Sequence, residues 1–163
     1  MIQTRVKESG RTPMSTLSIS WSPEFETGID IIDQQHKRMF DYLDEINHAI
    51  ETCNGEEVEQ VIRELIDYSL SHNAFEESLM EQADYPMLEA HRDVHLAFKV
   101  RAHSYAFQLS QGNDPLRLAR EIRTDIALWL TNHIRHEDQH YVVFVKRSLC
   151  KNFVSRMLTR FFG

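Results

Sequence analysis

Apolar residues recur every three or four positions along most of this chain, and the strict alternation expected of strands is absent. A period of this kind is typical of helices that are buried on one side. It predicts helices over residues 33–53, 56–82, 86–111 and 115–145. In the first of these segments the apolar positions include Phe40, Leu43, Ile46 and Ile50. The chain is therefore predicted to be all-α.

Gly and Pro are few, 5 and 4 in number, and four of them lie where the predicted helices begin or end. Asn54-Gly55 is expected to end the first helix, and Pro86 is expected to be the first residue of the third helix. The segment Gly112-Asn113-Asp114-Pro115 predicts a turn and a helix cap. Long helices joined by such short turns predict an antiparallel, up-down-up-down four-helix bundle over residues 19–145.

Residues 1–18 are polar and contain no apolar stretch of the kind that directs secretion, so we expect a flexible N-terminal arm. Met14 is an alternative translation start, since the patterned part of the chain begins soon after it. No run of about 18 apolar residues occurs anywhere, and the only cysteines are Cys53 and Cys150. These features predict a cytoplasmic protein whose thiols stay reduced.

The formal net charge is −7, which argues against a nucleic-acid partner. The segment 146–163 differs from the rest, because it contains five of the 18 basic residues and none of the 25 acidic ones. Its apolar residues Leu149, Phe153, Met157 and Phe161 are four apart, which predicts a basic, amphipathic fifth helix. Covering an apolar gap on the bundle is the favoured role of this helix; docking another protein and contacting a membrane surface are the alternatives.

Five histidines and two carboxylates recur along the chain at spacings that suit one paired-metal site. They are His36, His72, Glu76, His91, His95, His133 and Asp138. Residues four apart share a helix face, and two pairs of these residues have that spacing. Every predicted helix contributes at least one of the seven, as in metal sites built inside helical bundles.

His133 and Asp138 are five residues apart, which separates them by about 140° around a regular α-helix. They can serve one site if the helix loosens there, or if Asp138 reaches between two metals. Ligand type narrows the metal, because no cysteine is among the candidates and imidazole dominates the set. This chemistry disfavours structural zinc, calcium and magnesium and favours iron, with manganese and zinc still open.

The candidate ligands lie within motifs that resemble those of the hemerythrin family in its bacterial form. The motifs are Trp21…Thr27-Gly28-Ile29…Ile32-Asp33…Gln35-His36, His72-x-x-x-Glu76-Glu77-x-x-Met80, Tyr85-Pro86, His91-x-x-x-His95 and Trp129-Leu130-x-x-His133-Ile134-x-x-x-Asp138. They agree in order and spacing, and the resemblance covers residues 19–142.

This resemblance implies a non-haem di-iron centre, with an oxo or hydroxo bridge, that binds O2 reversibly. By position, one iron would be held by His91, His95 and His133 and the other by His36 and His72, with Glu76 and Asp138 bridging the two. Two octahedral irons would then have one coordination position open, on the iron with two histidines, where O2 would bind.

Three further residues bear on an O2 pocket. Trp129 and Leu130 resemble residues that line the pocket in the family, although ordinary core packing is equally compatible with them. The family usually has Phe where this chain has Asn73. If Asn73 faces the pocket, it would hydrogen-bond O2 or admit water; if it points away, Phe75 would fill the space.

Three functions follow from the resemblance. We expect a binding protein rather than an enzyme, which stores oxygen or delivers it to an oxygen-consuming protein in a bacterial cell. The alternatives are an O2 or redox sensor that acts on a signalling partner through residues 146–163, and, last, a di-iron oxidase. Glu45-x-x-His48 and Glu137-x-x-His140 match an element of ferritin-like proteins, but a site built on them would leave five aligned histidines unused.

Overall fold

The computed structural model describes residues 19–162, with side chains through residue 151, so the predicted arm 1–18 and Met14 lie outside the described residues. The helices are α1 (Asp30–Glu51), α2 (Gly55–Gln82), α3 (Leu88–Ser110), α4 (Pro115–Asn132) and α5 (Gln139–Phe162). A short 3-10 helix, η1 (Pro23–Phe25), precedes α1, and a π-helical turn, η2 (His133–Asp138), joins α4 to α5. The described residues contain no strand, and the predicted all-α class is confirmed.

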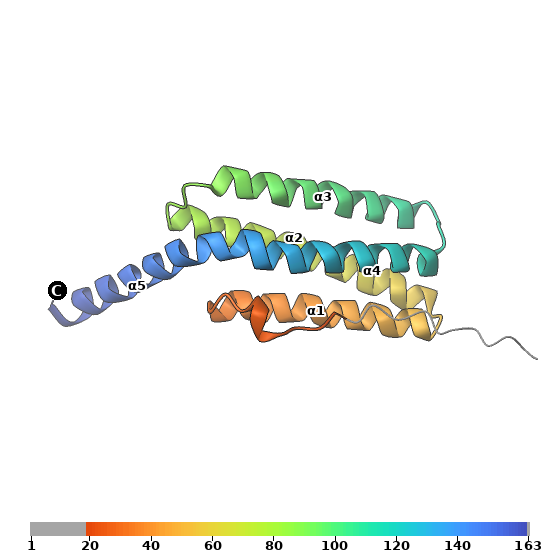
Figure 1. Ribbon diagram of the computed structural model, residues 1–163, viewed down its shortest axis with the longest axis horizontal. Helices are drawn as coiled ribbons and strands as arrows, with labels where there is room; N and C mark the ends of the chain where they lie inside the picture. Colours follow the sequence, from red (N-terminus) through yellow and green to blue (C-terminus); the bar gives the residue numbers. More distant parts are fainter. Residues whose placement is uncertain (1–18, 163) are drawn as a thin grey trace, which may run out of the picture.

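Helices α1 to α4 lie alongside one another and alternate in direction, which confirms the predicted bundle (Figure 1). The predicted cap before Pro115 is present, and Asn54, which was expected to end the first helix, caps the start of α2. The Asn54 side chain accepts a hydrogen bond from the Glu57 backbone N–H (3.2 Å), and Asp114 accepts one from that of Leu116 (3.0 Å). Each cap satisfies a backbone donor that a helix start leaves free.

The start of α3 differs from the prediction by two residues. Pro86 lies in the turn before the helix, which begins at Leu88. The Leu88 N–H donates to the carbonyl of Tyr85 (3.2 Å), so Pro86 is enclosed by this turn. The chain leaves α2 through Asp84, which has a positive φ of 51°, and needs the extra residues to reverse direction.

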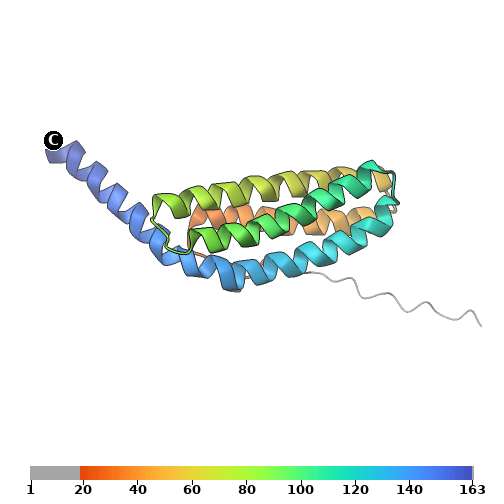
Figure 2. The same cartoon turned by 90° about the horizontal axis from the view of Figure 1, so that it is seen from above.

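The C-terminal helix also differs from the prediction, since residues 115–162 form one continuous helical run through η2. No Gly or Pro lies between residues 116 and 162 to interrupt it. In both views the C-terminal part of α5 projects beyond the ends of the other helices (Figures 1 and 2). This part therefore does not cover an apolar gap on the bundle.

The chain enters α1 through a turn built on a buried carboxylate. Asp33 is 8% exposed and accepts hydrogen bonds from the backbone N–H of Thr27 (2.8 Å), the Thr27 hydroxyl (2.7 Å) and the N–H of Gly28 (3.0 Å). Gly28 has φ +68°, a conformation that few other residues adopt without strain. The turn thus sets the direction in which α1 enters the bundle.

The apolar core forms two clusters along the length of the bundle. The larger one includes Met39 and Phe40 of α1, and the smaller one includes Ile32 of α1 and Met80 of α2. His36 lies between the two clusters along α1, and the corresponding stretch of α2 also contains polar residues. A polar layer is therefore enclosed by apolar side chains on both sides. None of the helices in the described part of the chain is long and apolar enough to cross a bilayer.

Core packing on α4 can be tested with two leucines of the same helix. Leu118 is 0% exposed, so Leu118→Ala should lower the free energy of unfolding by about 2–5 kcal/mol, since it leaves a cavity. Leu128 is 51% exposed, and Leu128→Ala should change the same quantity by less than about 0.5 kcal/mol. Urea unfolding followed by circular dichroism measures both, and equal effects would contradict the described orientation of α4.

Candidate metal centre

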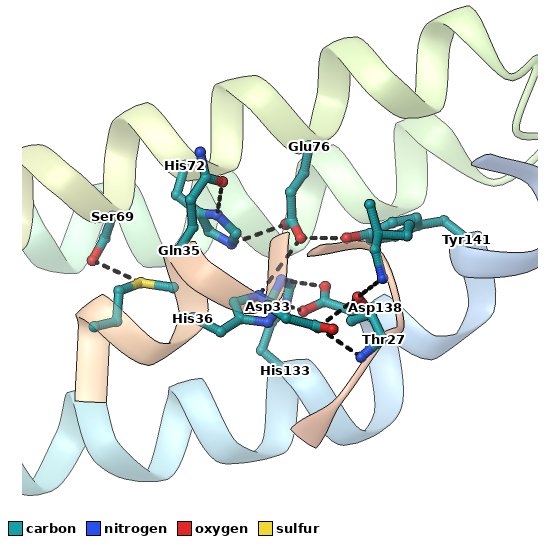
Figure 3. A network of polar contacts seen from close by, with 12 residues as sticks. Thr27, Asp33, Gln35, His36, Ser69, His72, Glu76, His133, Asp138 and Tyr141 are labelled. Atoms are coloured by element: carbon teal, nitrogen blue, oxygen red, sulfur yellow. Dashed lines mark hydrogen bonds and ion pairs between the residues drawn. The ribbon is translucent and has the colours of Figure 1, made fainter. Parts of the chain in front are cut away.

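All seven candidate ligands converge in the polar layer, and none is more than 3% exposed. Figure 3 shows His36 of α1, His72 and Glu76 of α2, and His133 and Asp138 of η2 facing one another. α3 supplies the remaining two, His91 and His95. Each helix thus presents its polar residues to the same point of the interior.

The donor atoms form two groups that share a carboxylate. One group consists of Glu76, His91, His95 and His133, and the other of His36, His72 and Glu76; within each group the atoms lie within 4.8 Å of one another. Asp138 also stands between the groups, because Oδ2 is 3.4 Å from His36 Nε2 and Oδ1 is 3.0 Å from His133 Nε2. Three histidines lie on one side of the two carboxylates and two on the other.

The π-helical turn explains how His133 and Asp138 meet. A π-turn pairs residue i with residue i+5, so residues five apart lie on nearly the same face. Residues His133–Asp138 adopt this conformation, and His133 Nε2 is within 3.0 Å of Asp138 Oδ1. The predicted loosening of the helix is confirmed, and Asp138 also reaches both groups.

Three polar side chains around the cluster were not predicted to have a role. Gln35 Oε1 lies 2.9 Å from His72 Nδ1, and Glu77 Oε1 lies 2.8 Å from His95 Nδ1. An acceptor at Nδ1 fixes the tautomer and directs the lone pair of Nε2 into the cluster. The Tyr141 hydroxyl donates to Glu76 and orients that carboxylate. Gln35 and Glu77 are each adjacent in sequence to a candidate ligand, and this position was the one feature of the sequence that could have indicated their role.

Several buried atoms of the cluster have no hydrogen-bond partner among the described residues. They are His36 Nδ1 and Nε2, His72 Nε2, Glu76 Oε2, His133 Nδ1 and both carboxylate oxygens of Asp138. Unpaired buried polar atoms are costly, and charged ones more so. Bound cations would satisfy most of them at once, so the donor set fits a metal site.

Burial shifts the protonation of the cluster toward metal-binding forms of the histidines. Desolvation, together with neighbouring histidines, lowers the pKa of His91 and of His95 to about 3. The same causes lower the pKa of His72 well below its ordinary value. These imidazoles are therefore neutral at pH 7 with free lone pairs. Burial raises the pKa of Glu76 well above its usual range, and nearby Asp138 adds to this, so a cation is needed to keep both carboxylates ionised.

Trp129 and Leu130 lie beside the cluster. The Trp129 ring stacks on His133, with centroids 4.5 Å apart and planes inclined by 14°, and its other neighbour is Phe98 at 4.0 Å. Leu130 is 1% exposed and belongs to the larger apolar cluster. Both residues pack in the core, and their part in an O2 pocket stays a prediction.

Asn73 is 4% exposed and lines a pocket between α2 and α3. Phe75, which was the alternative filler of this space, packs instead against the smaller apolar cluster with Met80. The ferritin-like elements do not converge, because His48 and His140 are exposed. Cys53 and Cys150 are exposed free thiols.

Comparison with known proteins agrees with this geometry. Residues 27–145 match the family described as Hemerythrin HHE cation binding domain. The chain is 40% identical over 151 residues to the Bacteriohemerythrin of Stenotrophomonas maltophilia, which covers 88% of this chain and 97% of the relative. It is 38% identical over 154 residues to that of Pseudomonas aeruginosa (strain LESB58), with the same coverage. The Myohemerythrin of Theromyzon tessulatum is 26% identical over 121 residues, covering 74% of this chain and 88% of the relative.

The partner of His95 yields a prediction on metal affinity. Glu77→Ala removes the acceptor at His95 Nδ1 and should weaken metal binding about 10–100-fold, because the imidazole is no longer held in one tautomer and orientation. Glu81→Ala is the matched control, since Glu81 also faces Arg92 but is exposed and touches no candidate ligand. Competition against a coloured chelator measures both affinities. Equal affinities in the two variants would contradict the orienting role of Glu77.

Proposed function

The chain belongs to the hemerythrin family, and on that premise we propose that it binds O2 reversibly at a non-haem di-iron centre. The observation that carries the proposal is the division of five histidines into a group of three and a group of two, with two carboxylates between them. This is the arrangement expected for two metals that share their carboxylate ligands.

The residues would divide as follows. His91, His95 and His133 would hold one iron, His36 and His72 the other, and Glu76 and Asp138 would bridge them together with an oxo or hydroxo group. Two ferrous ions would supply the electrons and the open coordination position that reversible O2 binding requires. The two carboxylate charges offset much of the charge of these cations, which makes the centre tolerable in an apolar interior.

The protein's own groups would limit the water at this site and hold its ligands rigid. Every proposed ligand is at least 97% buried, and apolar clusters lie on both sides, so few water molecules are available to donate protons to a bound ligand. The Trp129 stack restrains His133, and the Tyr141 hydroxyl donates a hydrogen bond to Glu76. Burial and Glu76 raise the pKa of Tyr141 well above its ordinary value, so it retains that proton.

We further propose that O2 binding serves storage or delivery to an oxygen-consuming protein in the bacterial cytoplasm, rather than an enzymatic reaction. Support comes from the names of the bacterial relatives and from the exposed positions of His48 and His140, which leave the ferritin-like elements without a shared site.

A sensory function is the second candidate, and one observation favours it. Asp138 ends η2 and Gln139 begins α5 in the same continuous helical run, so a displacement at the centre can be transmitted to the projecting part of α5. Limited proteolysis of this segment with and without O2 tests the idea. A cleavage rate that does not respond to O2 would contradict it.

Anaerobic reconstitution with ferrous iron tests the proposed function. We expect two irons per chain and a visible charge-transfer band that forms in air and disappears on deoxygenation. Steady O2 consumption in the presence of a reductant would instead indicate an oxidase. Fewer than two irons per chain, or a colourless protein in oxygen, would overturn the di-iron assignment.

The ligand assignment predicts the effect of His72→Ala. This variant should lose the iron of the two-histidine group and with it O2 uptake, while its helical content is nearly unchanged, because α2 keeps its apolar contacts. His48→Ala is the control, as His48 is an exposed residue of α1. Iron analysis, O2 uptake and circular dichroism measure the three quantities, and unaltered iron content in His72→Ala would refute the assignment.

A further inference from the structure

Asn73 is a buried amide whose hydrogen-bonding capacity is not used by any group in the described part of the chain. It lies on α2 directly after His72 and is 4% exposed. Neither Nδ2 nor Oδ1 has a hydrogen-bond partner among the described residues. An unsatisfied amide in a protein interior is destabilising, and native proteins usually satisfy such groups with ordered water or a ligand. Asn73 is therefore placed to bind a small polar molecule.

The space for such a molecule adjoins the side chain. A pocket of about 700 Å³ lies between α2 and α3, and Asn73 lines it. The pocket is open to solvent at its outer end, where exposed Leu96 and Lys99 contribute to the lining. Its volume is typical of pockets that take small molecules and exceeds that needed for a single water. Solvent can therefore enter the pocket from the surface, whereas both polar atoms of the Asn73 amide are buried at its inner end.

The inner end of this pocket borders the metal centre. His95 also lines the pocket, and its Nε2 lies 3.0 Å from His133 Nε2 inside the donor cluster. The other nitrogen of His95 is paired with Glu77, a further lining residue. Asn73 follows the candidate ligand His72 directly in sequence. One layer of side chains thus separates the pocket from the donor atoms.

The charges along the pocket favour small anions near Asn73. Helices α2 and α3 run antiparallel, and Glu77 of α2 pairs with His95 of α3. Asn73 is one turn before Glu77 and Lys99 is one turn after His95, so Asn73 and Lys99 lie opposite each other. Toward the turn that joins α2 and α3, the acidic Glu77 and Glu89 are both paired with Arg92, at 3.5 and 2.6 Å. Asp93 adds a negative charge there, away from Asn73. An anion that enters beside Lys99 would meet that charge first and the Nδ2–H donors of Asn73 further in.

We propose that the α2–α3 pocket is an access path by which water and small anions reach the metal centre, and that Asn73 hydrogen-bonds them at its inner end. The inference rests on the proposed function for the identity of the centre. The role of Asn73 is then to bind water and anions that pass through the pocket. O2 is apolar and gains little from an amide donor.

Azide binding to the iron-loaded, oxidised protein tests the path. Asn73→Leu fills the space and removes the amide, and should slow azide association about tenfold, the effect of roughly one lost hydrogen bond to an anion. Asn73→Ser keeps a donor and should bind azide within about twofold of the wild-type rate.

Asn132→Leu is the matched control. Asn132 is an exposed asparagine that also neighbours a candidate ligand, His133, but it lines a separate, smaller pocket with Trp129. This variant should bind azide at the wild-type rate. Equal slowing by both leucine variants, or no slowing by Asn73→Leu, would overturn the proposed path.

A crystal structure of the purified wild-type protein supplies a readout that does not depend on activity. We expect an ordered water or anion within hydrogen-bonding distance of the Asn73 amide, continuous with the α2–α3 pocket. An Asn73 side chain bonded only to protein groups would refute the inference. Failure of the wild-type protein to hold iron would instead count against the proposed function, and the crystallographic result would still decide the role of Asn73.

Discussion

Two carboxylates and five imidazoles are buried together at one point of this bundle, and the other features of the structure depend on how these groups are stabilised there. Glu76 and Asp138 are both fully buried, and the paired donor of Glu76 is the neutral hydroxyl of Tyr141. Two carboxylates cannot remain ionised side by side in an apolar interior without compensating charge. Bound cations provide that charge, so metal binding also stabilises the polar layer.

The surrounding elements hold the ligands in the positions that the site requires. The widened turn of η2 brings His133 and Asp138 to one face, and Gln35 and Glu77 fix the imidazoles of His72 and His95. Apolar clusters on both sides of the layer hold the four helices at the required separation. Because these supports come from different helices, the site exists only when the whole bundle has assembled.

The surface of the bundle is not uniform around this buried layer. Between α2 and α3 a pocket reaches Asn73 and the outer side of His95, whereas Trp129 covers His133 on the α4 side. The helical run that provides Asp138 continues as the projecting part of α5. The α2–α3 pocket and the continuous helical run thus lead from the buried centre toward the surface, the first bearing on ligand access and the second on signalling.

The sequence alone determined the helical period, the turns at Asn54 and Asp114, and the set of seven candidate ligands, because these depend on local spacing and residue chemistry. The tertiary structure alone decided which donors meet. The contacts of Gln35 with His72 and of Tyr141 with Glu76 join residues far apart in the chain, and no local period encodes them. The position of Asn73 was also left open by the sequence, since it depends on how α3 packs against α2. Helix spacing is a property of a segment, whereas a site in a bundle is a property of how the segments pack.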